Sequence, residues 1–233
     1  MFRILLVDDD PTLSEITREY LEARDLSVLL CNNPANALDL LKRHHSDICL
    51  LDVKMPEIDG FTLAEEIRKK DKEIPIVFLT GQTMKEDRIR GLMLGADDYI
   101  LKPYSMEELY LRVIAIMKRY KNSGTKNNIP NTYQFGKIIF HTGSREIITD
   151  NQTIRLTAIE NKLLSLLCAN LNGTLSRDRA LQEIWGDNDI YKGRSMNVYI
   201  NKLRNILKVE PDIEILNAHG EGYILSYKGS LPE

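Results

Sequence analysis

The stretch ICLLDVKMPEIDG, residues 48–60, decides the fold class of this chain. Its first four residues are apolar, one carboxylate follows at Asp52, and the chain then enters a loop containing Met55, Pro56 and Gly60. A run that is apolar at every position, rather than at alternate positions, is typical of a strand covered by helices on both faces of a parallel sheet. Sites in such sheets lie at the carboxyl ends of the strands, so Asp52 stands where we expect one.

Four further apolar runs have this form, and a segment with helical period follows each of the five. The other runs are FRILLV, SVLLC, IPIVFLT and DYILK, which begin at residues 2, 27, 74 and 98. Alternating strands and helices predict an α/β domain with a doubly wound (βα)5 parallel sheet over residues 1–120.

Composition restricts the class of protein. The chain has 233 residues, 43% hydrophobic and 28% charged, and no apolar run approaches the roughly 18 residues that span a bilayer. Its beginning, MFRILLVDDD, turns acidic too early for a signal peptide, so we expect a cytoplasmic protein with no membrane partner. Cys31, Cys49 and Cys168 stand singly in apolar segments without metal-ligand spacing, which predicts buried reduced thiols.

The pattern changes after residue 120. Residues 121–132, KNSGTKNNIPNT, are polar and predict a flexible linker. Residues 133–156 predict an antiparallel meander, three helical segments follow, and a hairpin turning at Gly220 to Gly222 closes the chain. We therefore expect a second, smaller α+β domain over residues 133–233.

Polar side chains follow the strands of the first domain in a particular order: Asp8 and Asp9, Asp52, Thr80, then Lys102. Neighbouring parallel strands would crowd these carboxylates together, and a hard cation such as Mg²⁺ would relieve their repulsion. A carboxylate can also attack a phosphoryl donor, with Lys102 neutralising the transferred oxygens. Taken singly, the acids could serve only as charge at a helix N-terminus, and the threonine and lysine as ordinary strand-end residues.

Four motifs together resemble the receiver domain of two-component response regulators. They are LLVDDD, LLDVKMPEIDG, IVFLTG and GADDYILKPYS. The resemblance implies that Asp52 is the phosphoacceptor, that Asp9 binds Mg²⁺ directly with Asp8 as its helper, and that Lys102 binds the phosphoryl group. It also implies a metal ligand from the backbone carbonyl of Lys54.

The same resemblance implies a conformational switch. Thr80 and Tyr99 match the family's switch pair, and Pro103 matches a proline that follows a cis peptide bond. Gly81 stands where many relatives have alanine, which adds backbone freedom beside Thr80.

Charged residues near the end of this domain match positions that pair across the active dimer in one receiver subclass. These residues are Arg88, Asp98, Glu108 and Arg112. The alternative is a solvated charged face, where single ion pairs contribute little. We expect a homodimer in the activated state, because a twofold contact would position two effector domains at once.

The segment GRSMNVYINKLRNILK, residues 193–208, separates by helical period into an apolar stripe and a polar side without acids. The stripe is Met196, Tyr199, Ile200, Leu203 and Ile206 or Leu207. The residues expected to meet DNA are Arg194, Asn197, Asn201, Lys202, Arg204, Asn205 and Lys208, with His219 in the closing hairpin. Such a helix suits a DNA groove, although a solvated basic helix has the same pattern.

The segment LTAIENKLLSLLCANLNGTLSRDRALQEIW, the helix at residues 193–208 and the closing HGEGY together resemble the winged-helix effector domain of the OmpR/PhoB class of response regulators, from about Tyr133 to Tyr227. By that resemblance the helix at residues 194–207 enters the major groove, and the hairpin follows the minor groove. The loop from Trp185 to Arg194 would face RNA polymerase, with Trp185 itself in the core. His219 and Ile224 stand where basic residues are frequent, and His219 could make DNA binding sensitive to pH.

These expectations combine into a transcriptional regulator that binds specific double-stranded DNA after a sensor histidine kinase phosphorylates Asp52. Two alternatives stay open: a small phosphohydrolase using the same acids, and a regulator whose control bypasses phosphate. A phosphatase would need a second catalytic acid near Asp52, and the residue two positions on is Lys54, which favours storage of the phosphoryl group over turnover.

Overall fold

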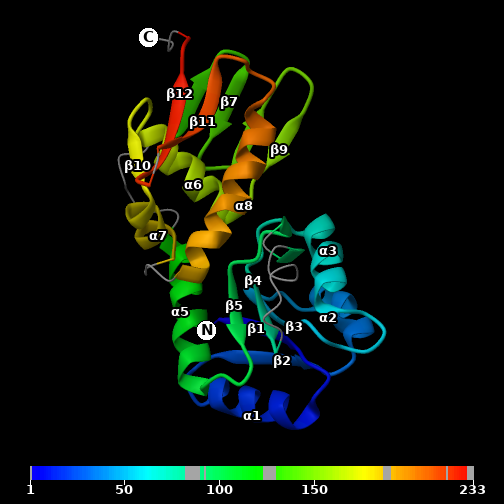
Figure 1. The fold of residues 1–233 in the computed structure, drawn as a ribbon. Coiled ribbons are helices and arrows are strands. Elements are labelled where there is room, and N and C mark those ends of the chain that lie inside the picture. The colour runs from blue at the N-terminus through cyan, green and yellow to red at the C-terminus, as the bar shows by residue number, and fades with distance from the viewer. Residues whose placement is uncertain are drawn as a thin grey trace. The chain divides into compact units, whose positions relative to one another are not determined.

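The computed structural model in Figure 1 describes residues 2–81, 90–91, 93–122, 130–185, 190–218 and 220–229, with the backbone alone at residues 119, 121–122 and 190–195. The chain divides into two compact units, Met1–Ser123 and Gly124–Glu233. Among the described residues, no helix combines the length and the apolar character that a membrane crossing requires.

The first unit contains a five-stranded sheet in the order β2-β1-β3-β4-β5, with every neighbouring pair parallel. The strands are β1 (Arg3–Val7), β2 (Ser27–Cys31), β3 (Ile48–Asp52), β4 (Ile76–Thr80) and β5 (Asp98–Leu101). Every residue of β3 and β4 is buried, as the continuous apolar runs predict. The predicted parallel sheet is confirmed.

Helices cover both faces of this sheet (Figure 1). They are α1 (Pro11–Glu22), α2 (Ala37–Arg43) after the short 3-10 turn η1 (Pro34–Asn36), α3 (Gly60–Lys70) and α5 (Met106–Asn122). Leu50 and Leu79 face a core shared with Leu21 of α1 and Val113 of α5. Side chains of the opposite face pack against Phe61 and other residues of α3, which confirms the doubly wound arrangement.

The turn between β1 and α1 is fixed by its own capping residue. The Asp10 side chain accepts hydrogen bonds from the backbone N–H groups of Thr12 and Leu13, at 2.9 and 3.0 Å. Pro11 opens the helix, where its missing N–H costs no hydrogen bond. This cap holds the short segment that carries Asp8 and Asp9 at the end of β1.

The segment predicted as a linker overlaps two observed elements. Helix α5 continues through Asn122, and strand β6 already begins at Thr132. Residues 123–129, most of the predicted linker, lie outside the described residues.

The second unit begins with a four-stranded antiparallel meander, β6 (Thr132–Phe135), β7 (Ile138–His141), β8 (Glu146–Ile148) and β9 (Thr153–Arg155). Helices α6 (Ala158–Ala169), α7 (Arg177–Trp185) and α8 (Ile190–Leu207) follow, and then β11 (Ile213–Ala218) and β12 (Gly222–Tyr227). The predicted meander and closing hairpin are confirmed, with Ala218 paired to Gly222 next to the turn. Strand β10 (Thr174–Ser176), which pairs with β12, was not predicted, because three residues carry no readable period.

The apolar stripe of α8 lies in the core of this unit. Met196, Tyr199, Ile200, Leu203 and Leu207 are all at most 2% exposed, while Ile206 is only partly buried. Trp185 is 8% exposed with its ring centroid 6.2 Å from that of Tyr199, so its predicted place in the core is confirmed.

All three cysteines are buried free thiols, as predicted. Burial raises the pKa of Cys49 to about 12 and also raises the pKa of Cys168. Reactive thiolates are therefore disfavoured at both positions.

Candidate functional site

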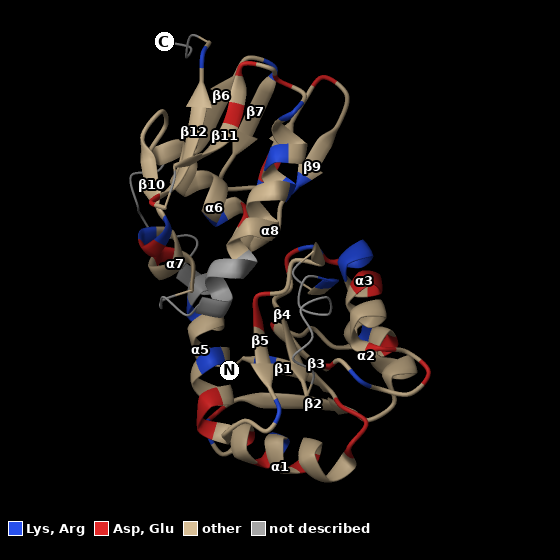
Figure 2. Cartoon of the chain, in the orientation of Figure 1, with Lys and Arg blue, Asp and Glu red and all other residues tan. Residues whose placement is uncertain are grey.

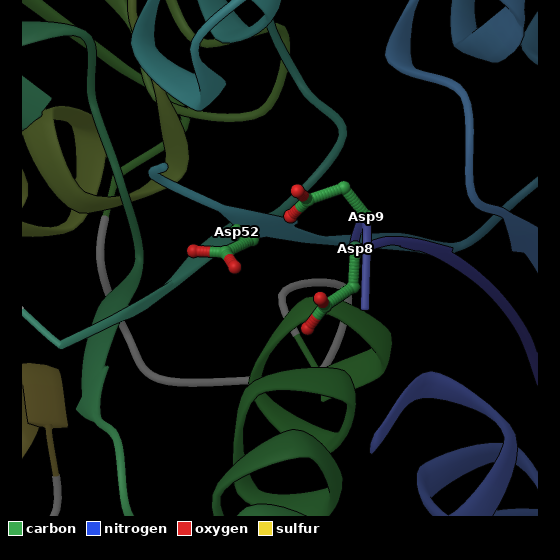
Figure 3. A group of neighbouring side chains, drawn as sticks. All are labelled: Asp8, Asp9 and Asp52. Carbon is green, nitrogen blue, oxygen red and sulfur yellow. The ribbon is translucent and has the colours of Figure 1, made fainter. Parts of the chain in front are cut away.

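Three carboxylates meet at the carboxyl ends of two neighbouring strands (Figure 3). Strands β1 and β3 pair with Val7 opposite Leu51, so the residues that follow, Asp8 and Asp52, lie side by side. One oxygen of each of Asp8, Asp9 and Asp52 lies within 4.8 Å of the others. Asp8 and Asp52 are 1% and 7% exposed, whereas Asp9 is exposed.

Lys102 supplies a cation to this cluster. Its Nζ donates to Asp8 Oδ2 and to Asp52 Oδ2, each at 2.7 Å. Burial lowers the pKa of Lys102, but the hydrogen bonds to both carboxylates outweigh it and the net shift is upward. The ammonium therefore stays charged and holds Asp52 beside Asp8.

The donor set fits a hard divalent cation. Among the described residues, the ammonium of Lys102 bonds Asp8 and Asp52, and Asp9 adds a third carboxylate to the cluster, which leaves an excess of negative charge in a small volume. Carboxylate oxygens at this spacing suit Mg²⁺, which takes oxygen ligands and keeps several waters. The Lys54 backbone N–H donates to Asp52 Oδ1 at 3.1 Å, which fixes the Asp52 side chain from the loop side.

The loop after Asp52 closes onto the strand end. Gly60 donates its backbone N–H to Val53 O at 3.1 Å. A Cβ added at Gly60 would lie 2.1 Å from the backbone oxygen of Asp52, so only glycine permits this approach. The glycine of the 48–60 stretch thus lets α3 begin directly against the strand end that carries Asp52.

The predicted switch residues lie on the strands beside this cluster. Thr80 ends β4 and is 2% exposed, and the peptide bond between Lys102 and Pro103 is cis. The Tyr99 ring packs 5.2 Å from the ring of Phe78. A Cβ at Gly91 would lie 1.2 Å from the Tyr99 hydroxyl oxygen, so that hydroxyl occupies space left by a missing side chain. Gly91, eight residues before Tyr99, was not predicted as part of the site, because no local pattern marks it.

Three of the four residues predicted at a dimer contact form one network within the chain. Arg112 donates to Asp98 Oδ2 and to Glu108 Oε1, each at 2.9 Å. Arg88 lies outside the described residues. Leu101 and Leu111 on the same two elements, β5 and α5, are 40% and 57% exposed.

Helix α8 presents its polar side as predicted: its sequence contains no Asp or Glu, and Figure 2 shows Lys and Arg along its described part. Asn197, Asn201, Asn205 and Lys208 are exposed. Arg204 donates to Ile215 O at 2.8 Å and to Asn217 Oδ1 at 2.9 Å, both on β11. The side chain of Arg194, and all of His219, lie outside the described residues.

Lys202 has a partner that the sequence analysis missed. Its ammonium donates to Oε1 of Glu160 on α6, whose side chain is 6% exposed. Glu160 also accepts from the backbone N–H of Thr157 at 2.9 Å, which completes a capping box at the start of α6. The Thr-x-x-Glu spacing signals the capping box in the sequence, but the contact with α8 is not local.

Comparison with known proteins is consistent with this geometry. Residues 4–114 match the family described as response regulator receiver domain, and residues 151–225 match transcriptional regulatory protein, C terminal. The transcriptional regulatory protein RprY of Bacteroides fragilis is 47% identical over 223 residues, covering 96% of this chain and 94% of RprY. This chain belongs to the response regulators of the OmpR/PhoB class.

Solved structures share the fold over nearly the whole length of the chain. A mutant of RitR matches with a TM-score of 0.74 and 24% identity, covering 97% of this chain and 99% of that one. DrrB, an OmpR/PhoB homologue from Thermotoga maritima, matches with a TM-score of 0.50 and 24% identity, covering 97% of this chain and 99% of DrrB. The two family matches and the similarity to RprY, not the structural matches, identify this chain as a response regulator that combines a receiver domain with a DNA-binding domain and regulates transcription.

Proposed function

We propose that Asp52 of this response regulator accepts a phosphoryl group from a sensor histidine kinase and that the modified protein dimerises and binds promoter DNA. The observation that carries the proposal is the hydrogen bonding of Asp52, whose two oxygens accept from the Lys54 N–H and from the Lys102 ammonium. These two donors orient the carboxylate at the end of β3.

The chemistry is a phosphoryl transfer to a carboxylate. One oxygen of Asp52 forms a bond to phosphorus while the bond from phosphorus to the donor nitrogen of the kinase histidine breaks, and the histidine keeps that electron pair. The Lys102 ammonium, 2.7 Å from Asp52, would bond the oxygens that arrive. The product is an acyl phosphate on Asp52.

The metal ligands in this proposal are Asp8, Asp9, Asp52 and the backbone carbonyl of Lys54. Mg²⁺ bound there would neutralise charge on the transferred oxygens. Asp8 is held for this task by Lys102 on one oxygen and by the backbone N–H of Asp10 on the other, at 3.0 Å. Asp9 is the exposed member and would accept the metal from solvent.

The phosphoryl group would be stored and only slowly lost by self-dephosphorylation. Position 54, two residues beyond the acceptor, carries lysine rather than a second acid. A turnover enzyme needs a general acid or base within reach of the phosphoryl group.

Thr80 and Tyr99 would convert phosphorylation into a change of surface. A phosphoryl group beside Thr80 offers new acceptor oxygens, and a move of Thr80 would change the space available to Tyr99. The homodimer contact would use β5 and α5, where exposed Leu101 and Leu111 stand beside the charged network. The charged members of that contact would be Arg88, Asp98, Glu108 and Arg112.

In the dimer, α8 would enter the major groove of double-stranded DNA and the β11–β12 hairpin, with His219, would follow the minor groove. Arg194, Asn197, Asn201, Asn205 and Lys208 would face the DNA. Lys202 and Arg204, bonded to α6 and β11, would set the position of the helix. The segment from Trp185 to Arg194 would meet RNA polymerase, and the protein would act in the cytoplasm, where its DNA is.

The test is intact-mass spectrometry of the full chain with Mg²⁺ and acetyl phosphate, compared with the Asp52→Asn variant. We expect a metal-dependent gain of one phosphoryl group in the natural protein and none in the variant. Asp8→Asn is a second variant, which should slow the gain without removing the acceptor. A folded natural protein that gains no phosphoryl group would refute the proposal.

A further inference from the structure

The exposed ridge of α8 consists of amide side chains. Asn197, Asn201 and Asn205 are spaced four residues apart, so they follow one another along one face of the helix, and all three are exposed. The described cations of α8 are not on this ridge. Lys202 and Arg204 lie on its two flanks, where they bond Glu160 of α6 and Ile215 O of β11.

Two of the three amides are oriented by neighbouring side chains. Arg204 Nη1 donates to Oδ1 of Asn201 at 3.2 Å, and because arginine only donates, this contact decides which end of the amide is oxygen. The Tyr223 hydroxyl on β12 donates to Oδ1 of Asn197 at 2.6 Å. Each amide keeps both N–H hydrogens and one further lone pair on its oxygen.

That combination of a donor beside an acceptor matches one base edge in the major groove. Adenine presents the N6 amino donor beside the N7 acceptor, whereas guanine presents two acceptors, N7 and O6, that suit arginine or lysine. We infer that the ridge Asn197, Asn201 and Asn205 reads adenines, so that the operator of this regulator has adenine at the base pairs facing α8. This inference rests on the proposed function and specifies the DNA that the same helix binds.

The spacing gives a footprint. Residues four apart on a helix are about 6 Å apart along its axis, against about 3.4 Å for one base-pair step. Neighbouring asparagines therefore meet bases one or two steps apart, and the three together cover about four or five base pairs. Lys208, exposed beyond the last turn, lies on the same side and suits a phosphate.

The test begins with selection of binding sites from a randomised duplex pool by the full chain phosphorylated with acetyl phosphate. We expect adenine to be enriched within the half-site. Asn201→Ala and Asn205→Ala should each relax the preference at one base pair, by roughly 5- to 100-fold in affinity for adenine over other bases. Lys208→Ala is the matched control on the same surface, and it should weaken all sequences equally.

The selected duplex is then remade with 7-deazaadenine, which lacks the N7 acceptor, at each enriched adenine. Binding by the natural protein should fall at those positions, and binding by the corresponding asparagine variant should not fall further. Enriched sites with guanine facing α8, or a base preference unchanged in both asparagine variants, would overturn the inference and leave the proposed function standing. Absence of any enriched sequence, with phosphorylation confirmed by mass, would overturn the proposed function itself.

Discussion

Lys102 in the first unit and Lys202 in the second each place an ammonium on a buried carboxylate, but the charges balance differently. Among the described side chains, Lys202 pairs with Glu160, and the other oxygen of Glu160 accepts the Thr157 N–H. Lys102 is shared between Asp8 and Asp52, with a third acid, Asp9, close by. The pair in the second unit is complete and holds two helices together, whereas the cluster in the first unit keeps an excess of negative charge.

The difference shows how a reactive site can be told from a structural ion pair. A carboxylate whose acceptor positions are filled has no further ligand to attract, and its removal is felt as lost stability. A group of carboxylates with too few cations attracts a metal ion and perturbs the reactivity of its members. The comparison therefore predicts different kinds of effect from similar substitutions at the two lysines.

The largest effect should follow Lys102→Met. Loss of the ammonium removes the donor for the incoming phosphoryl oxygens, so phosphorylation by acetyl phosphate should slow about 10²-fold. Mg²⁺ should bind more tightly, because a competing positive charge is gone. Mass spectrometry against time and calorimetric Mg²⁺ titration measure the two changes. Lys42→Met, the same change at an exposed lysine of α2, is the control, and equal rates in the two variants would contradict the assignment of Lys102.

Gly60→Ala should come next, as a test of how tightly the loop closes on Asp52. The new Cβ would meet the Asp52 backbone oxygen at 2.1 Å, so strand or helix must shift at a cost of about 2–3 kcal/mol in the free energy of unfolding. Gly81→Ala is the matched control, because a Cβ there meets no described atom within 4 Å. Urea unfolding of the receiver unit in the full chain compares them, and equal midpoints would show that the loop adapts freely.

Substitutions in the Lys202–Glu160 pair should lower the stability of the second unit and its affinity for DNA, but should leave the salt dependence of DNA binding unchanged. Lys202→Met and Glu160→Gln should each cost about 1–2 kcal/mol of unfolding free energy, with a double variant costing less than the sum. Both should weaken DNA binding while the slope of log affinity against log salt stays unchanged, since neither residue would meet a phosphate. Lys208→Met should lower that slope by about 0.9. A lower slope in Lys202→Met would place Lys202 on the DNA instead.

The smallest effect concerns Asp10, the exposed cap beside the acidic cluster. Backbone hydrogen bonds from Leu13 and Thr12 hold the pKa of Asp10 below its ordinary value of 3.8. A carboxyl whose pKa is lowered in the folded protein contributes its full stabilisation of the fold above pH 3.8. This contribution is lost as the pH falls through the pKa of the folded state. Asp10→Asn keeps the cap at neutral pH. It should flatten the decline of the urea midpoint that the natural protein shows below pH 3.8. An identical decline in both proteins would show that Asp10 contributes nothing to it.

The sequence predicted which residues gather at the acidic cluster, because the order of strands carries that information. Asp8, Asp52, Thr80 and Lys102 each end or follow a strand, and parallel pairing of those strands then brings them to one edge. The stripe of α8 was equally readable, because its period of burial is set by the helix itself. Local pattern is sufficient wherever topology or helical geometry converts it directly into position.

What the sequence did not show depends on contacts between distant side chains. The bond between Lys202 and Glu160 joins residues 42 positions apart. The fit of the Tyr99 hydroxyl over Gly91 and the approach of Gly60 to Asp52 are equally steric facts of packing. No helical or strand period encodes which partner a flanking charge selects, so these contacts required the structure.

The most direct test of the account measures DNA affinity in two states of one protein. A duplex carrying the selected site is titrated with the full chain before and after phosphorylation, with the extent of modification read by intact mass in the same sample. We expect binding to tighten about 10²-fold after phosphorylation, through a dimer that joins two half-sites, and to stay unchanged in Asp52→Asn. Equal affinity in both states at full phosphorylation would contradict it and indicate control that does not pass through Asp52.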